Sequence, residues 1–585
     1  MNIAITGEGI VSAIGNDKAS VLQSLIDGKT GIGEIHYLSS LHNELPVGEV
    51  KLSNAEMKAK LGIPTDNAIS RTTLLGMLAV RQAVDEACIS EAGNERVLLI
   101  SGTTVGGMDI TEQWYGTFAD SDEHLACIKS HECGCSTEDI AAAFGIFTDS
   151  TTISTACSSA ANAIILGARL LECGQADVVV AGGSEALSRF HLNGFNSLMI
   201  LDHEQCRPFD ATRAGLNLGE GAAFIVMETA EHAAKRNAAI HAYLTGYGNA
   251  CDAYHQTASS ENGDGAYLAM REAIEMSSLQ PGDIDYVNAH GTGTPNNDLS
   301  ESAALKRIFG ETMPPVSSTK SFTGHTTSAS GSIETVICLL AMLHHFIPTN
   351  LGWKHQMADG ITPTMGEQGR DMRNVLCNSF GFGGNDSSLI LSTVPKDSKV
   401  PKNPKTPQAI TLSRFEISTI EQLADIRQYV KPLEARRMGK IMKSSYFSSV
   451  KALEDAGIET PDAIITATAR GCLENGEHLL QQLEEEGEVM LKPTWFMQST
   501  HNTIGSDIAI RTGCHGYNIT YSHGEKSLEW ALRDAEMLIT SGKATTVLVG
   551  LHDESTPLFN SFMERLGKKP LPLVHSVAIV LGVKK

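Results

Sequence analysis

Three residues that lie far apart along the chain could together carry covalent acyl chemistry. Cys157 lies in the segment Ser-Thr-Ala-Cys-Ser-Ser-Ala-Ala, before a long apolar stretch. His290 lies in Ala-His-Gly-Thr-Gly-Thr-Pro, and His325 lies in Lys-Ser-Phe-Thr-Gly-His. A thiolate is a strong nucleophile toward a thioester, and an imidazole can act as a base or as a hydrogen-bond donor. The three residues therefore indicate acyl transfer through a thiol.

The residues after Cys157 predict a buried helix that would activate the thiol. Residues 158–171 are of helical length and almost entirely small or apolar. Unpaired N–H groups and the helix dipole at an N-terminus favour an anion. We therefore expect the pKa of Cys157 to fall by about one unit or more from the usual ~8.5. A structural core cysteine is the alternative for an isolated residue, and the two histidine motifs argue against it.

A pair of histidines beside one thiol suits decarboxylation. Two neutral imidazoles that donate to one thioester carbonyl would stabilise the enolate formed as carbon dioxide leaves, by about 2.7–4 kcal/mol per donor. A hydrolase triad needs only one histidine. Lys320 and Glu334 flank His325 in the sequence. A Lys320–Glu334 ion pair would neutralise an ammonium in the site, whereas a surface lysine and an exposed helical glutamate are the alternative.

A glycine-rich loop, Asn-Ser-Phe-Gly-Phe-Gly-Gly-Asn-Asp at residues 378–386, joins two expected strands. It lacks the Lys-Ser/Thr of a phosphate-binding loop, and it does not have the dinucleotide-binding fingerprint. Phosphate binding is therefore not favoured.

Together these motifs resemble those of the β-ketoacyl-(acyl carrier protein) synthases of the elongating, Cys-His-His type. Further matches are Arg207-Pro-Phe-Asp, Leu218-Gly-Glu-Gly, and Asp298 with Glu301 after the His290 motif. The resemblance spans residues 1–394. It implies an α/β, thiolase-like fold in which two pseudo-equivalent halves stack as five alternating layers of helix and sheet.

The resemblance also implies a role for each matching residue. Cys157 would be the nucleophile, and the backbone N–H groups of Cys157 and Phe382 would form the oxyanion hole. His290 and His325 would act in catalysis with Lys320 and Glu334. The implied substrate-pocket residues are Val105, Thr292, Thr294, Phe380 and Phe382. Arg207 is a candidate for carrier docking, with a salt bridge to Asp210 or Glu220 as the alternative. The sequence departs from the family at Asn385-Asp386, where Thr-Asn is common.

The implied reaction is a decarboxylating Claisen condensation of an acyl-cysteine with malonyl-acyl carrier protein. It would give a β-ketoacyl-acyl carrier protein in fatty acid, aryl polyene or other polyketide synthesis. The implied partners are acyl carrier proteins bearing acyl and malonyl groups, and a second copy or another ketosynthase-like chain in a dimer. No cofactor or metal is implied. A non-elongating decarboxylase, or a chain-length-factor-like partner of another ketosynthase, is the alternative.

Composition narrows the class of partner. The chain has 585 residues and a formal net charge of −23, which makes nucleic acid or an anionic membrane an improbable partner. There is no run of about 18 apolar residues for a membrane span. The N-terminal residues predict a buried strand and do not have the pattern of a signal peptide. A cytoplasmic protein is therefore expected. An acidic carrier would need a local basic patch.

The cysteines indicate reduced thiols. Twelve are scattered through apolar segments of a long chain, which fits buried thiols better than a disulfide framework. Cys127, His131, Cys133 and Cys135 form one cluster in the sequence. Its Cys-x-Cys step is tighter than usual zinc spacing and no second pair follows, so we do not expect a metal there.

A Pro/Lys-rich stretch at 395–407 is expected to be an extended linker. It separates a ketosynthase N-terminal half (1–235) and C-terminal half (236–394) from a last domain at 408–585. Several segments of 408–585 repeat segments of 1–235 in the same order, which favours duplication. This pairing puts Glu525 opposite Cys157, and no counterpart of either histidine motif follows. The last domain is therefore expected to be non-catalytic and to cover a surface or stabilise assembly.

Overall fold

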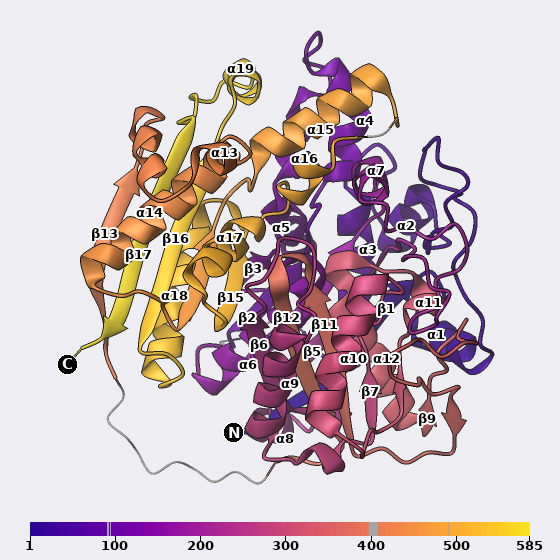
Figure 1. The fold of residues 1–585 in the computed structure, drawn as a ribbon. Helices are drawn as coiled ribbons and strands as arrows, with labels where there is room; N and C mark the ends of the chain where they lie inside the picture. The colour runs from indigo at the N-terminus through magenta and orange to yellow at the C-terminus, as the bar shows by residue number, and fades with distance from the viewer. Residues whose placement is uncertain (91–92, 94, 397–406, 490, 585) are drawn as a thin grey trace.

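The computed structural model describes the chain except for residues 91–92, 94, 397–406, 490 and 585, so most of the expected linker lies outside the described residues. Fifteen strands form one sheet, built from three groups of five (Figure 1). The first group contains β1 (Ile3–Ser12), β2 (Val97–Gly102), β3 (Asp149–Ile153), β4 (Val178–Glu185) and β5 (Gly221–Thr229). The second contains β6 (Ala242–Cys251), β7 (Tyr286–Asn288), β8 (Val316–Ser317), β11 (Asn374–Gly381) and β12 (Asn385–Ser392). The third contains β13 (Ala409–Ile417), β14 (Ala463–Ala467), β15 (Tyr517–Tyr521), β16 (Thr546–Glu554) and β17 (Val574–Val583).

The three groups share one topology. Their strand orders are β1-β5-β4-β2-β3, β6-β12-β11-β7-β8 and β13-β17-β16-β14-β15. In each group the first two pairings are antiparallel and the last two are parallel. The repeat predicted from the sequence is therefore confirmed, and the same unit occurs three times.

The first two groups form a layered body. Between the first and second groups of strands lie α6 (Ser159–Glu172) and α12 (Ser330–Leu343), which contact each other and are buried on nearly every face. The outer faces are covered by α3 (Arg71–Glu86) on one side and by α9 (Asp264–Ser277) and α10 (Pro295–Phe309) on the other. Small and apolar side chains let α6 pack against sheets and helices at once. The predicted α/β fold with five alternating layers is confirmed.

The third group belongs to residues 408–585, called here the half-unit. Its β15 pairs antiparallel with β3 through Tyr521 and Ile153, so one sheet runs through both units. Backbone N–H groups of Ser154 and Ser522 donate across this junction at 2.9 and 3.0 Å. Next to the junction, Arg169 on α6 and Asp534 on α18 (Ser527–Thr540) form a buried ion pair of 2.5 Å.

The half-unit also reaches over the first unit, residues 1–394. Its α15 (Leu473–Glu486) and α16 (Pro493–Met497) lie against α4 (Met108–Trp114) and α7 (Arg189–Ser197) (Figure 1). Apolar side chains of both units form one cluster there.

The remaining helices are α1 (Lys18–Ile26), α2 (Asn54–Leu61), α5 (Cys133–Phe144), α8 (Ala230–Lys235), α11 (Lys320–Thr323), α13 (Pro432–Ala435), α14 (Lys440–Ala456), α17 (Thr503–Thr512) and α19 (Pro557–Arg565), with the short strands β9 (Phe346–Ile347) and β10 (Glu367–Gln368).

A tight turn precedes the equivalent helix in each group. These turns are η3 (Ala156–Ser158), η5 (Thr327–Ala329) and η8 (Gly524–Lys526). Each begins with a positive φ: 50°, 43° and 54°. Cys157 is the middle residue of η3, and Glu525 is the middle residue of η8, which agrees with the pairing expected from the sequence. Positive φ is costly for an alanine or a threonine and is held by the surrounding packing.

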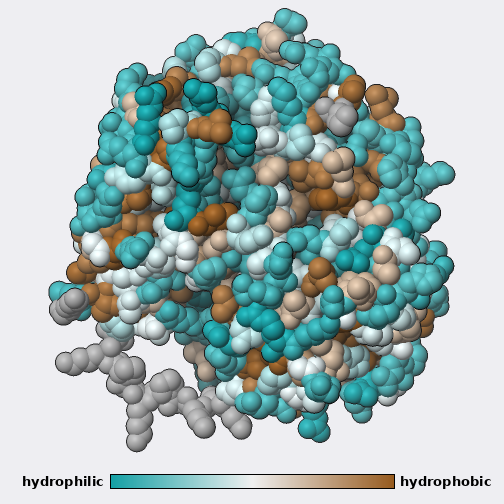
Figure 2. Space-filling model, in the orientation of Figure 1, coloured by the Kyte–Doolittle hydropathy of each residue, from teal (hydrophilic) through white to brown (hydrophobic). Residues whose placement is uncertain are grey.

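The surface shown in Figure 2 is largely hydrophilic, and hydrophobic side chains gather near α7. The segment after α7 includes Met199, which is 85% exposed. Among the described residues, no helix combines the length and the apolar character needed to cross a membrane.

Candidate active site

The fold brings the thiol and the two imidazoles together. One ligand-type atom of each of Cys157, His290 and His325 lies within 4.8 Å of the others. His325 Nε2 lies 3.0 Å from Cys157 Sγ. The rings of His290 and His325 meet edge to face, with centroids 5.3 Å apart. All three side chains are buried, at 5%, 2% and 2% exposure.

The turn that carries Cys157 is fixed by hydrogen bonds within its own segment. Ser159 Oγ accepts from the Thr155 N–H at 2.8 Å, and Asn162 Nδ2 donates to Thr155 Oγ1 at 2.8 Å. These bonds and the positive φ of Ala156 fix the backbone at Cys157, shortly after the end of β3. The Cys157 sulfur then lies next to His325, which belongs to the second group of strands and helices. Phe382 directly follows the last residue of β11, and its backbone N–H is within hydrogen-bonding reach of the Cys157 sulfur.

Each histidine is held by buried partners. The carboxylate of Glu301 on α10 accepts from the backbone N–H groups of His290 and Gly291, both at 2.8 Å. His325 Nδ1 lies 3.0 Å from Ser330 Oγ at the start of α12. If Ser330 donates to Nδ1, the ring's own N–H is on Nε2, toward the sulfur. Ser330 carries no distinct signal in the sequence, because several other serines stand close to it.

The Lys320–Glu334 pair is buried. Lys320 Nζ lies 2.5 Å from Glu334 Oε1, and the side chains are 1% and 3% exposed. The alternative of an exposed lysine and glutamate is therefore wrong. Burial raises the pKa of Glu334 to about 7, against the charge of Lys320, which lowers it. The pair joins α11, just before His325, to α12, and it places a positive charge near the thiol.

The protonation state differs from the expectation for Cys157. Burial raises the pKa of its thiol to about 12, and the charge of Lys320 and the Phe382 N–H lower it only in part. The expected decrease is wrong, because α6 begins two residues later at Ser159 and desolvation of the thiolate dominates. Burial also lowers the pKa of His290 and of His325 well below the usual value. The resting site therefore holds a neutral thiol and two neutral imidazoles.

A cavity of about 380 Å³ opens onto the three residues. Thr292, Thr294, Phe380 and Phe382, all expected in the pocket, line it. Val105 does not line this cavity. It is 4% exposed in the apolar cluster that the half-unit shares, so its place in the substrate pocket remains a prediction.

The half-unit contributes residues near the site that the sequence analysis missed. The Phe382 ring stacks on Phe195 at 5.7 Å, and Phe195 meets Phe496 of α16 at 5.2 Å. Asn502, just before α17, contacts the loop of Phe382 and Asn385. The sequence held no signal for these residues, because the contact depends on how the two units dock.

Arg207 forms intramolecular ion pairs. Its Nη1 lies 3.2 Å from carboxylate oxygens of Asp202 and Glu204. The alternative partners, Asp210 and Glu220, bind elsewhere: Asp210 accepts from backbone N–H groups, and Glu220 pairs with an arginine on α3. Carrier docking at Arg207 remains a prediction.

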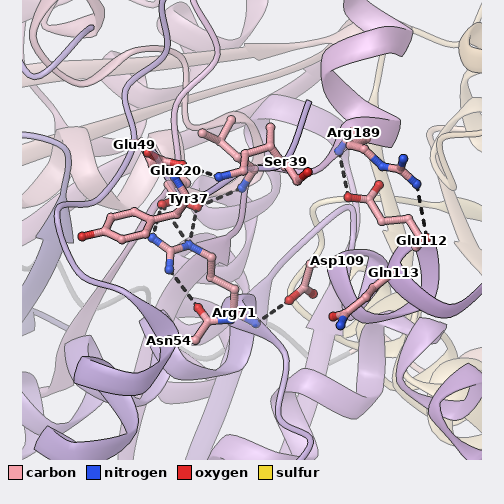
Figure 3. Close-up of a pocket in the computed structure, with 12 residues that line it drawn as sticks. Tyr37, Ser39, Glu49, Asn54, Arg71, Asp109, Glu112, Gln113, Arg189 and Glu220 are labelled. Carbon is pink, nitrogen blue, oxygen red and sulfur yellow. Dashed lines mark hydrogen bonds and ion pairs between the residues drawn. The ribbon is translucent and has the colours of Figure 1, made fainter. Parts of the chain in front are cut away.

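A larger, polar cavity of about 570 Å³ lies outside the site (Figure 3). In it, Arg71 and Glu220 form a buried ion pair of 2.6 Å, and Glu220 also accepts from the backbone N–H of Val50 and Leu187. The glutamate of the Leu-Gly-Glu-Gly motif therefore holds three segments together. Burial raises the pKa of nearby Glu112 to about 8.

The Cys127 cluster of the sequence does not form a metal site among the described residues. Groups of three close His, Cys, Asp or Glu ligands occur at the Cys157 site and at Glu8, Glu86 and His241. Cys135 Sγ instead donates to the carbonyl oxygen of Lys129 at 2.9 Å.

Known protein families match both units. The β-ketoacyl synthase N-terminal domain matches residues 1–233, the C-terminal domain matches 241–354, and a second N-terminal domain matches 414–584. Over 407 residues the chain is 32% identical to 3-oxoacyl-[acyl-carrier-protein] synthase 2 of Vibrio cholerae, covering 66% of this chain and 98% of that protein.

Solved structures that resemble this chain are also ketosynthases. The ishigamide ketosynthase/chain length factor is 30% identical with a TM-score of 0.62, covering 67% of this chain and 99% of that one. The PfaC keto synthase-chain length factor is 17% identical with a TM-score of 0.81, and it covers 100% of this chain and 78% of that one. The latter shows a shared fold across both units. The resemblance found in the sequence is confirmed: this chain belongs to the β-ketoacyl synthase family.

Proposed function

We propose that the protein is an acyltransferase that condenses an acyl group, held on Cys157, with malonyl-acyl carrier protein. The observation that supports this most directly is the convergence of one thiol and two neutral imidazoles in one cavity. Relatives that are 32% and 33% identical to this chain are 3-oxoacyl-[acyl-carrier-protein] synthases. The product is a β-ketoacyl-acyl carrier protein, in fatty acid or polyketide synthesis.

In the first step, Cys157 Sγ attacks the thioester carbonyl of the acyl carrier. The C–S bond to the carrier breaks, and the thiol proton goes to the departing carrier sulfur. The carbonyl oxygen carries negative charge meanwhile, and the N–H groups of Cys157 and Phe382 stabilise it. Because the resting thiol is neutral, the proton leaves as the new bond forms.

In the second step, malonyl-carrier occupies the cavity beside His290 and His325. Their N–H groups donate to its thioester carbonyl while the C–C bond to the carboxylate breaks and carbon dioxide leaves. The carbanion then attacks the acyl-cysteine carbonyl, and the Cys157 thiolate departs and takes up a proton from solvent, which restores the neutral thiol. Lys320, paired with Glu334, adds positive charge near both histidines and favours their neutral form.

The half-unit is proposed to act as a silent, built-in partner of the first unit. Glu525 stands where a nucleophile would be, and a carboxylate does not replace a thiolate in acyl transfer. The ishigamide and Xenorhabdus doucetiae ketosynthases are solved with chain length factors. We infer that the ketosynthase-like partner expected for this protein is part of the same chain, joined at β3 and β15.

Replacement of the nucleophile tests the function. Cys157→Ala is expected to abolish both the acyl-enzyme, detected as an added mass on the intact protein, and condensation with malonyl-carrier. Incubation of the unmodified protein with a panel of carrier-bound acids of different lengths would identify, from the same mass measurement, the acyl group that it accepts. Retention of labelled acyl-protein in this variant would contradict the proposal.

The two histidines are expected to differ in the same assays. His290→Ala should suppress decarboxylation by roughly a hundredfold or more while largely preserving acylation, because His290 serves the malonyl carbonyl. His325→Ala should impair both steps, since its Nε2 also lies 3.0 Å from the thiol sulfur. Equal losses of acylation in the two variants would count against this division of roles.

A further inference from the structure

The loop that carries Phe382 has little rigidity of its own. Its central turn is η6 (Phe382–Gly384), with Gly381 and Asn385 on either side. Gly383 and Gly384 have φ angles of 83° and 75°, in the left-handed region that favours glycine. A glycine-rich segment can adopt many conformations. The direction of the Phe382 N–H must therefore be fixed by contacts from outside the loop.

The first unit holds the glycines of the loop: the Gly383 N–H donates to the Gln256 carbonyl oxygen, and the Asp252 N–H donates to that of Gly384, both at 2.8 Å. The contacts to Phe382 and Asn385 described next come from the half-unit. Asn502 Nδ2 lies 2.8 Å from the carbonyl oxygen of Phe382 and 2.7 Å from Oδ1 of Asn385. Asn385 Nδ2 in turn donates to the carbonyl oxygen of Asn518 on β15 at 3.1 Å. Asn502 is 1% exposed, so water does not compete for these bonds. Asn385 is also one of the two residues, Asn385-Asp386, at which the sequence departs from the common family pattern.

Shape complementarity reinforces the hydrogen bonds. A Cβ at Gly383 would lie 2.2 Å from Ser506 Oγ on α17, so the loop packs directly on that helix. The Phe382 ring is fixed as well, through Phe195 and then Phe496 of α16. The half-unit therefore contacts the Phe382 backbone directly through Asn502, and it supports the Phe382 ring indirectly, through Phe195 of the first unit.

We propose that Asn502 is a positioning residue for the oxyanion hole of the first unit. By binding the Phe382 carbonyl it restrains the backbone rotation of that residue, and so keeps the Phe382 N–H directed at the Cys157 sulfur. A donor stabilises a developing oxyanion only if it is already aimed there. The inference rests on the proposed role of Phe382, and it gives the half-unit a part in acylation without any reacting group.

Asn502→Ala in the full chain tests this assignment. The kcat of Cys157 acylation by an acyl-carrier thioester should fall about ten- to a hundredfold, with KM nearly unchanged, because only transition-state stabilisation is lost. Decarboxylation of malonyl-carrier, which relies on His290 and His325, should stay within about twofold of the unmodified protein. Asn502→Asp, which keeps the volume but removes the donor, should show the same split.

Asn475→Ala is the matched control. Asn475 is 7% exposed and donates to the Gln498 carbonyl oxygen at 3.0 Å, within the half-unit. It should leave both rates unchanged. Unchanged acylation in both Asn502 variants would overturn the inference, as would equal losses of acylation and decarboxylation, or an equal loss in the control. If the unmodified protein forms no acyl-enzyme, the proposed function itself fails, and this inference with it.

Discussion

At the scale of single residues, burial decides the chemistry of the site. The Cys157 thiol and both imidazoles are neutral at rest because the charged form of each would lose its hydration. Neutral imidazoles keep an N–H that can donate to a carbonyl without first losing a proton. The thiol becomes nucleophilic only as its proton leaves, so the site suits a thioester, whose departing sulfur accepts that proton.

Alkylation measures this state of Cys157 directly. The rate of its reaction with iodoacetamide should rise about tenfold per pH unit between pH 7 and 9, because the thiolate fraction of a group with a pKa of about 12 grows in that way. Peptide mass spectrometry separates Cys157 from the exposed Cys88 and Cys173. A rate that levels off near pH 7 would show a thiol activated at rest, contrary to this expectation.

At the scale of elements, the site depends on short segments held by buried charge. The four-residue helix α11 precedes His325, and the Lys320–Glu334 pair ties it to α12. Both side chains are almost fully buried, so neither charge can be solvated if its partner is lost. The ion pair therefore keeps His325 at the right distance from the thiol as well as setting the local potential.

Removal of one charge from this pair should be costly. Glu334→Gln keeps the size of the side chain but leaves the Lys320 ammonium without a counter-charge, and is expected to lower the free energy of unfolding by about 3–5 kcal/mol. Denaturant titration gives the value. The matched control is Glu275→Gln on α9, whose pair with Arg271 is exposed and which should change stability by less than about 0.5 kcal/mol. Similar effects of the two substitutions would contradict a structural role for the buried pair.

At the scale of the whole molecule, one chain contains three copies of a five-stranded unit. Two form the catalytic body, and the third closes the edge of the first through β3 and β15. An uncovered strand edge would be open to pairing with another chain. The buried Arg169–Asp534 pair and the shared apolar cluster fix the third copy in place. The half-unit therefore occupies a surface that would otherwise be available to a second chain.

This arrangement predicts that the protein works as a single chain. Light scattering at micromolar concentration should give the mass of one chain, 62.5 kDa, for protein that is active in condensation. The physical reason is that the β3 edge and the loop of Phe382 are already satisfied within the chain. A mass twice that value for the active species would show that a second copy is needed.

The sequence alone determined the chemistry and the fold class. Cys157, His290 and His325 stand in segments whose residue types are dictated by tight turns and buried neighbours, so each motif is visible without coordinates. The buried helix after Cys157 was equally visible in the sequence, as was the repeat that puts Glu525 opposite Cys157. These features are local, and local sequence encodes them.

The tertiary structure decided what depends on distant neighbours. The pKa of Cys157 follows from how completely the site is buried, and a helix N-terminus in the sequence could not reveal that. The partners of Arg207 and the position of Val105 depend on which segments pack side by side. The contact of Asn502 with the Phe382 loop joins residues 120 positions apart in two units. Burial and docking are properties of the assembled chain, and no single segment specifies them.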